Sequence, residues 1–428
     1  MILETDSQTM EDLGIFGQRD RSGICDLYNH THTRGGEAVL QEMFRNPLAN
    51  RDAINRRSSI IKHFAQLRIA FPFDAAALDM AEKYLASADE RAKHRQSPLS
   101  EKEIVNGVTA IIALMQRINV FITAKEVTNI NAYTEERTSI ILLLENPAFE
   151  PVFREKGKGK LSYGAVAAYD TLFRMSERNN VEQLLAHIYH MDVYLSVATV
   201  ALERKFVFPE AMEKGGGILH LEGVYHPELK QPIVNNLSMS DGQNLVFLTG
   251  ANMAGKSTFL RAVSTALYVA HMGFPVAAAG MRFSVMDGIF TTINLPDNLG
   301  IGASHFYAEV LRVKKVATEL HRGKSLFIVF DELFRGTNVK DAHEATVAIT
   351  RAFSRKKSSL FIISSHIVEA GGELRAQAAA AFLYLPTRMN GHTPEYTYTL
   401  EKGITDDRHG MIIIRNEGIL DILKRRRL

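Results

Sequence analysis

The sequence predicts a chain in two parts, α-helical in its first half and α/β in its second. Apolar residues of the first half recur at alternating intervals of four and three, the spacing of a helix that buries one face. The second half alternates short apolar runs with longer segments of helical pattern, as in an α/β domain. A glycine triplet at 215–217 has the composition of a linker. We therefore expect a helical domain over residues 1–210 and an α/β domain over residues 215–428.

Two segments show the helical pattern most clearly. Residues 101–122 carry a 4-3-4-3 apolar stripe, made of Ile104, Val108, Ile111, Met115 and Ile118. Residues 181–202 carry a similar stripe, made of Leu184, Ile188, Met191, Leu195, Ala198 and Leu202. Such stripes predict long helices packed lengthwise, as in a lever or a bundle. An ordinary helical core explains them equally well and implies no function.

Composition narrows the class of protein. A chain of 428 residues with 46% hydrophobic and 23% charged residues is typical of a soluble protein of two or three domains. The net charge of +2 means that any contact with nucleic acid depends on local basic patches. The single cysteine, Cys25, fits a reducing cytoplasm. The apolar segment 104–122 contains Arg117 and three amides, so we expect no membrane span, and the N-terminus shows no secretory signal.

The strongest motif follows the first apolar run of the second half. Residues 245–258 read LVFLTGANMAGKST and fit the pattern G-x-x-x-x-G-K-[ST] through Gly250, Gly255, Lys256 and Ser257. Loop N–H groups and the following helix N-terminus attract phosphate, the lysine contacts the β- and γ-phosphates, and the serine hydroxyl binds Mg²⁺. A chance cluster in a surface turn would not explain the strand before the motif or the helix after it. The motif predicts a nucleoside triphosphate site.

A second apolar run ends in two acidic residues. It extends from Leu326 to Phe330 and is followed by Asp331 and Glu332. Ligands of doubly wound sheets lie at the carboxyl ends of the strands, which places this pair beside the phosphates. Asp331 can hold Mg²⁺ and Glu332 can polarise an attacking water. An acidic pair after a strand is often only a solvated loop or a helix cap. Its combination with the phosphate loop is what favours hydrolysis.

Four segments of the second half together carry a more specific pattern. They are TGANMAGKSTFLRAV at 249–263, DNLGIGASHFYAEV at 297–310, DELFRGTNVKDA at 331–342 and SSHIVEA at 364–370. Together they resemble the ATPase domain of the MutS family of DNA mismatch-repair proteins, which belongs to the ABC-type ATPase class. Weaker similarity to the family's helical core extends the resemblance to nearly the whole chain from about residue 13.

The resemblance implies roles for individual residues. Those expected to bind ATP are Gly250, Asn252, Met253, Ala254, Gly255, Lys256, Ser257, Thr258, Ser304 and Asp341. Ser257 and Asp331 would hold Mg²⁺, and Glu332 would activate water. His366 would sense the γ-phosphate, although a lone histidine at a strand end can equally be a cap. Ser304 would reach the γ-phosphate of a second copy, and Asp341 would lie between the two sites. The resemblance therefore implies an ATP-dependent homodimer.

The sequence departs from the family pattern at several positions. His305 stands in place of threonine, and Phe334 and Ala342 stand in place of glycine. These changes bear on the hydrolysis rate and on contacts between the two sites more than on nucleotide binding. The segment 232–234, Pro-Ile-Val, lies where the family commonly has an aromatic residue for stacking on adenine. We therefore expect an apolar contact with the base.

The resemblance also implies DNA as a partner. The family's mismatch-reading domain precedes its helical core, and this chain begins near the core, so we expect a short form without mismatch reading and with a reduced clamp. The triplet 208–210, Phe-Pro-Glu, has the letters of the family's Phe-x-Glu wedge, but we interpret it as a connector. Binding of branched or non-specific DNA would then depend on backbone contacts by Lys156, Lys158 and Lys160.

The expected function is a cytoplasmic ATPase that couples its nucleotide state to DNA binding in repair or recombination. A different interpretation is an ATP-gated scaffold that grips a protein partner and never binds DNA. A third, a P-loop GTPase, is disfavoured because no Asn-Lys-x-Asp motif follows the loop. Residues 338–341, Asn-Val-Lys-Asp, have the wrong order.

Overall fold

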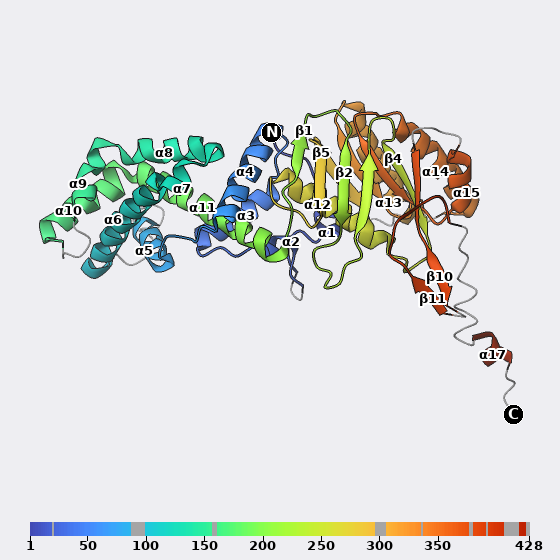
Figure 1. Cartoon of the computed structure of the whole chain (residues 1–428), viewed down its shortest axis with the longest axis horizontal. Helices are drawn as coiled ribbons and strands as arrows, with labels where there is room; N and C mark the ends of the chain where they lie inside the picture. The colour runs from blue at the N-terminus through green and yellow to red at the C-terminus, as the bar shows by residue number, and fades with distance from the viewer. Residues whose placement is uncertain are drawn as a thin grey trace. The chain divides into compact units, whose positions relative to one another are not determined.

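The computed structural model describes residues 1–18, 21–86, 99–155, 161–295, 305–334, 337–375, 380–390, 393–405 and 419–424. The chain forms two compact units (Figure 1). The helical unit comprises Cys25–Arg45 and Arg56–Arg204. The sheet unit comprises Met1–Ile24, Asn46–Asn55 and Lys205–Leu428. The helical pattern of the first half gave no sign that two of its segments would join the sheet unit.

The helical unit contains the long helices that the apolar stripes predict. Its main helices are α2 (Ile24–Leu27), α3 (Arg34–Arg45), α4 (Arg51–Leu67), α5 (Ala75–Ala86), α6 (Glu101–Thr123), α7 (Lys125–Thr128), α8 (Thr134–Leu144), α9 (Glu150–Arg154), α10 (Tyr163–Thr171) and α11 (Arg178–Arg204). The first residues of α2 and α4 belong to the sheet unit. Ser100 and Glu103 form a capping box at the start of α6, which fixes where this helix begins. Most of the predicted stripe positions in α6 and α11 are buried, whereas Leu202 is 45% exposed.

Helices α6 and α11 are long and apolar enough, by length and composition alone, to cross a membrane. Their most apolar windows have mean hydropathies of 1.5 and 1.2, and 50% and 72% of these windows is buried inside the structure. Close packing accounts for part of that burial. Gly107 of α6 faces the ring of Tyr84 on α5 so closely that an added Cβ would lie 2.3 Å from it. Such contacts are those of helices that pack in a protein core.

The sheet unit contains two main sheets (Figure 1). The larger has the order β12 (Glu401–Lys402), β9 (Ala380–Leu385), β4 (Leu245–Gly250), β8 (Leu360–Ser364), β7 (Leu326–Phe330) and β6 (Gly288–Thr292). All its pairings are parallel except that of β12 with β9. The other has the order β1 (Glu210–Met212), β5 (Gly280–Ser284), β2 (Leu219–Val224) and β3 (Asn235–Met239). A hairpin pairs β10 (Thr387–Asn390) with β11 (Thr393–Tyr396).

The helices of the sheet unit follow its parallel strands. They are α12 (Lys256–His271), α13 (His305–His321), α14 (Val339–Ser354) and α15 (Val368–Leu374), with α1 (Ser7–Asp12) near the N-terminus and α17 (Ile419–Lys424) near the C-terminus. Every residue of β4, β7 and β8 is buried, as expected of central parallel strands. The register pairs Leu248 with Ser364 and Phe330 with Ile363. The carboxyl ends of these three strands therefore meet at one edge of the sheet.

The N-terminal segment completes the opposite side of this sheet. Glu4 forms a parallel bridge with Gly288 of β6, and its N–H donates to the carbonyl of Asp287 at 2.8 Å. The Asp12 carboxylate accepts hydrogen bonds from the Thr291 hydroxyl and from the N–H groups of Ile293 and Asn294, at 2.8 to 2.9 Å. Residues 1–12 thus cover β6, which would otherwise be an open edge strand.

Candidate functional site

The phosphate-loop motif forms a tight turn between β4 and α12. Gly250 has φ 151° and Gly255, at the N-cap of α12, has φ 98°, conformations that favour glycine. Nζ of Lys256 lies over the loop and donates to the carbonyls of Gly250 at 2.8 Å and Ala251 at 3.1 Å. Burial lowers the pKa of Lys256, and the charges of Asp331 and Glu332 act in the opposite direction. The predicted strand, loop and helix are all present.

The remaining loop residues differ in exposure. Ala254 is buried, whereas Asn252, Met253 and Thr258 are exposed. Met253 is 76% exposed and has φ 68°, in the left-handed region that non-glycine residues rarely adopt. The loop backbone therefore turns tightly at Gly250 and Gly255, while the side chains of Asn252 and Met253 face solvent.

Asp331 is hydrogen-bonded to two hydroxyl groups. Its Oδ2 accepts from Oγ of Ser257 at 2.5 Å, and its Oδ1 accepts from Oγ of Ser364 at 2.7 Å. The two predicted metal ligands, Ser257 and Asp331, therefore come together. Sequence reasoning missed Ser364. Its signal was present, because it is the last residue of a buried strand next to β4, at the edge where the other site residues lie.

Glu332 and His366 also come together. Nε2 of His366 lies 2.6 Å from Oε1 of Glu332, and both side chains are partly exposed. Glu332 has φ 55°. A carboxylate and an imidazole in hydrogen-bond contact beside a phosphate loop are groups that can accept and orient protons.

Two predicted residues lie apart from this cluster or outside the described residues. Ser304 is not among the residues that the structure describes, and neither is the side chain of His305. Asp341 is exposed in the first turn of α14, where its N–H donates to the side chain of Asn338, the N-cap residue. The predicted roles of Ser304 and Asp341 at a second copy stay predictions.

Tyr398 lies against the phosphate loop and was not predicted. A Cβ added to Gly255 would lie 2.9 Å from Cδ1 of this ring. The side chain of Asn235 holds the segment, donating to the Tyr398 carbonyl at 2.9 Å and accepting from the Leu400 N–H at 2.7 Å. Tyr398 is 47% exposed. Ile233, in the segment expected to contact the base, is 50% exposed.

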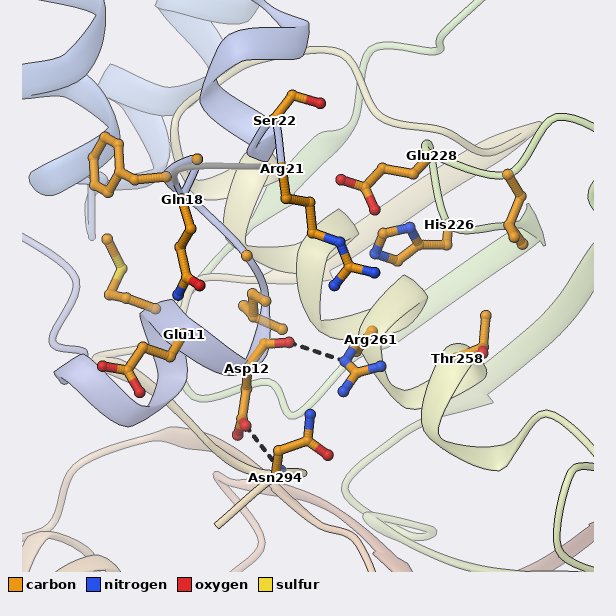
Figure 2. A pocket seen from close by; sticks show the side chains of 16 residues that line it. Glu11, Asp12, Gln18, Arg21, Ser22, His226, Glu228, Thr258, Arg261 and Asn294 are labelled. Carbon is orange, nitrogen blue, oxygen red and sulfur yellow. Dashed lines mark hydrogen bonds between the residues drawn. The ribbon is translucent and has the colours of Figure 1, made fainter. Parts of the chain in front are cut away.

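A cavity of about 560 Å³ lies beside the first turns of α12, and Figure 2 shows the side chains that line it. The N-terminal segment, the loop after β2 and the first turns of α12 line it, with Arg21, His226 and Thr258 among its polar residues. Nε of Arg261 donates to the Asp12 carbonyl at 3.0 Å. Burial lowers the pKa of His226; Glu228 opposes this shift, and Arg261 and Arg21 add to it. The cavity is therefore lined both by the N-terminal segment and by Thr258, the residue directly after Ser257.

Comparison with protein families gives this site a context. The model of MutS domain V matches residues 246–425, which include the phosphate loop, Asp331, Glu332 and His366. Over these residues the chain is similar to the MutS family. The match begins within β4, so the strand and loop that carry Lys256 are the start of the MutS domain. The C-terminal half of this mixed helical and sheet chain is therefore its MutS ATPase region.

Curated relatives carry the same family name. Each of three is called DNA mismatch repair protein MutS. The protein of Fusobacterium nucleatum is 29% identical over 257 residues, or 58% of this chain and 27% of the relative. That of Persephonella marina is 28% identical over 240 residues, with 55% and 27% covered. That of Brevibacillus brevis is 30% identical over 240 residues, with 54% and 27% covered. The matched region thus spans about a quarter of the length of these MutS relatives.

Proposed function

We propose that this chain binds ATP with Mg²⁺ and hydrolyses it. The observation that carries the proposal is the convergence of the phosphate loop, the Ser257–Asp331 pair and the Glu332–His366 pair at one edge of a parallel sheet. A hydroxyl and a carboxylate 2.5 Å apart suit Mg²⁺, which binds oxygen ligands and takes others from phosphates and water. Mg²⁺ held there would neutralise phosphate charge.

The side chains of the site have different proposed roles. Nζ of Lys256 exchanges the carbonyls of Gly250 and Ala251 for the β- and γ-phosphate oxygens. The Glu332 carboxylate accepts a proton from the attacking water. His366 orients that carboxylate through the 2.6 Å contact and would donate to the γ-phosphate. Ser364 holds the second oxygen of Asp331, which fixes the direction of the first.

For the base, we propose a stack on Tyr398. The ring is exposed, and Asn235 anchors its backbone against the loop. Aromatic faces favour offset stacking on planar rings. Ile233, on the same stretch as Asn235, would add an apolar contact. The site would then use an aromatic residue from the C-terminal end of the matched region as well as the apolar segment that the sequence indicates.

We further propose that nucleotide state is coupled to DNA binding and to pairing of two copies. The supporting observation is the similarity to relatives that are DNA mismatch repair proteins by name. The lysines proposed to contact DNA, Lys156, Lys158 and Lys160, and the proposed inter-copy contact Ser304 lie outside the described residues. Branched or non-specific DNA is the proposed ligand, bound through its phosphates.

The test measures nucleotide binding and hydrolysis in two variants. We expect Lys256→Ala to lose ATP binding. Glu332→Gln should keep binding and lose about 10²- to 10⁴-fold in turnover, since it removes the proton acceptor. Hydrolysis by Glu332→Gln at the wild-type rate would contradict the assigned role.

A second measurement addresses the partner. Matched, mismatched and four-way-junction DNA are titrated at several salt concentrations, with and without ATP. Phosphate contacts must weaken steeply with salt. Absence of DNA binding at low salt would instead favour the ATP-gated scaffold. Light scattering of Glu332→Gln with and without Mg-ATP reports the proposed pairing of two copies, because a ligand bound across an interface stabilises it by mass action.

A further inference from the structure

The turn after β7 holds two non-glycine residues in the left-handed region. Glu332 has φ 55° and Phe334 has φ 63°. This conformation is unfavourable for residues with a Cβ, because the Cβ approaches the following carbonyl oxygen. Two such residues within three positions persist only where the surrounding structure holds them. Something in the structure must therefore stabilise this turn.

The side chain of Phe334 is the part of the turn that is anchored. It is 3% exposed and belongs to the core between β7, β8, α13 and α14. Its ring lies 5.8 Å from that of Phe306, measured between centroids, with the planes at 56°. A tilted ring pair at this distance is a favourable aromatic arrangement. Because Phe306 is the second residue of α13, the contact joins the turn to the start of that helix.

The anchored turn also carries the proposed catalytic carboxylate. Glu332 is two residues before Phe334, and its Oε1 lies 2.6 Å from Nε2 of His366. If the turn relaxed to the right-handed region, the backbone rotation would redirect the Glu332 side chain. Lys256 and Ser257 belong to α12, and Asp331, which accepts from Ser257, is held by its own N–H bond to the Thr292 carbonyl at 2.9 Å. The strain of the turn therefore bears on the Glu332–His366 contact and not on the phosphate loop.

We propose that Phe334 is a positioning residue for hydrolysis. Its ring, packed on Phe306, holds the turn 332–334 in the left-handed conformation that presents Glu332 to His366. The start of α13 and the water-activating group thereby move together. This inference rests on the proposed ATPase function. It adds that the rate of the chemical step depends on the position of α13.

The test compares Phe334→Ala with Phe334→Gly. Both remove the ring, but glycine adopts φ near 63° without the Cβ penalty. We expect Phe334→Ala to lower kcat for ATP about 10- to 100-fold, with KM within about twofold of wild type. Phe334→Gly should recover a substantial part of that loss. Phe306→Leu changes no residue of the turn but removes the ring that Phe334 packs on, so it should lower kcat several-fold.

A simple packing role makes the opposite prediction. Removing a ring from the core would then lower the melting temperature in both variants and leave kcat of the folded protein unchanged, with glycine no better than alanine. Phe283→Ala is the matched control, because Phe283 is a buried phenylalanine of the other sheet. We expect it to lower the melting temperature and to keep kcat within about twofold of wild type. Equal kcat in Phe334→Ala, Phe334→Gly and wild type would overturn the inference.

A readout without nucleotide separates this inference from the proposed function. The imidazole NMR resonances of His366 should shift in Phe334→Ala, return toward wild type in Phe334→Gly, and stay unchanged in Phe283→Ala. If wild type fails to hydrolyse ATP while the His366 resonances follow this order, the proposed function is wrong and the positioning of Glu332 stands. If the resonances do not respond, the positioning is wrong whatever the rate of hydrolysis.

Discussion

Two buried or partly buried aspartates show how differently the two units use a carboxylate. Asp192 of the helical unit is fully buried and accepts from the backbone N–H groups of His32 and Thr33 and from the Thr33 hydroxyl, at 2.8 to 3.0 Å. Asp331 of the sheet unit accepts from the hydroxyls of Ser257 and Ser364. Two of the donors to Asp192 are backbone N–H groups, which cannot turn away, whereas both of these donors to Asp331 are hydroxyls, which can rotate toward a ligand. The first arrangement fixes the chain before α3, and the second leaves a carboxylate available for chemistry.

The largest expected effect separates these two aspartates. Asp192→Ala leaves buried N–H groups without an acceptor, so we expect the helical unit to lose about 3 to 5 kcal/mol of its free energy of unfolding. Asp331→Ala should change the stability of the sheet unit by less than about 1 kcal/mol and should abolish Mg²⁺-dependent hydrolysis. Urea unfolding followed by circular dichroism, together with an ATPase assay, measures both.

The comparison between the two aspartates would fail in either of two ways. If Asp192→Ala unfolds no more easily than wild type, backbone donors do not make a carboxylate structural. If Asp331→Ala loses stability without losing hydrolysis, the hydroxyl-bonded carboxylate is the structural one. Asp192→Asn is the milder control, because it keeps the shape of the side chain and one acceptor oxygen.

A second, smaller effect concerns His271 and pH. Its Nδ1–H donates to the Leu48 carbonyl at 2.8 Å, and its Nε2 accepts from the Met286 N–H at 3.4 Å, so backbone groups satisfy the neutral ring on both sides. Burial lowers the pKa of His271 to about 4, and the hydrogen bond to Leu48 opposes that shift. In the unfolded chain the histidine would titrate near its usual value of about 6.5.

The sign of the pH effect follows from this difference. Between about pH 6.5 and 4, His271 is protonated in the unfolded chain but stays neutral in the folded chain. Acid therefore favours unfolding over that range. The contribution is complete above about pH 6.5 and falls by at most roughly 3 kcal/mol toward pH 4. Unfolding measured across this range should show a steeper loss of stability in wild type than in His271→Gln. Identical slopes would show that backbone partners do not hold the ring neutral.

Part of the candidate site could be predicted from local sequence patterns. Asp331 and Glu332 directly follow one apolar run, Lys256 lies in the motif after another, and parallel strands bring their carboxyl ends to one edge. Local patterns were therefore enough to predict these three residues, whereas His366 was expected only from the resemblance. The bridge between Glu4 and Gly288 joins segments far apart in sequence, and no period in residues 1–24 marks it.

Long-range packing was the part that sequence reasoning missed. The departure at Phe334 was visible, but its left-handed φ and its contact with Phe306 depend on where α13 packs. Tyr398 lies against Gly255 and Asn235 holds its backbone, and neither residue belongs to the phosphate-loop motif. The contacts that shape the site come from packing of distant segments, which local propensity does not encode.

The smallest expected effect concerns Tyr398, whose backbone and side chain differ in the same way as the two aspartates, one held and the other available. Its backbone carbonyl accepts from Asn235 while the residue is 47% exposed, so the backbone is fixed and the side chain is available for a ligand. A stacked aromatic pair contributes about 0.5 to 1.5 kcal/mol. Tyr398→Ala should therefore raise the Kd for ATP about 2- to 10-fold. Tyr398→Phe should bind like wild type, because it keeps the face of the ring, and kcat should stay the same in both. Calorimetric titration of each variant with ATP gives these constants, and equal Kd values for wild type and Tyr398→Ala would place the base elsewhere, with the apolar contact of Ile233 as the next position to change.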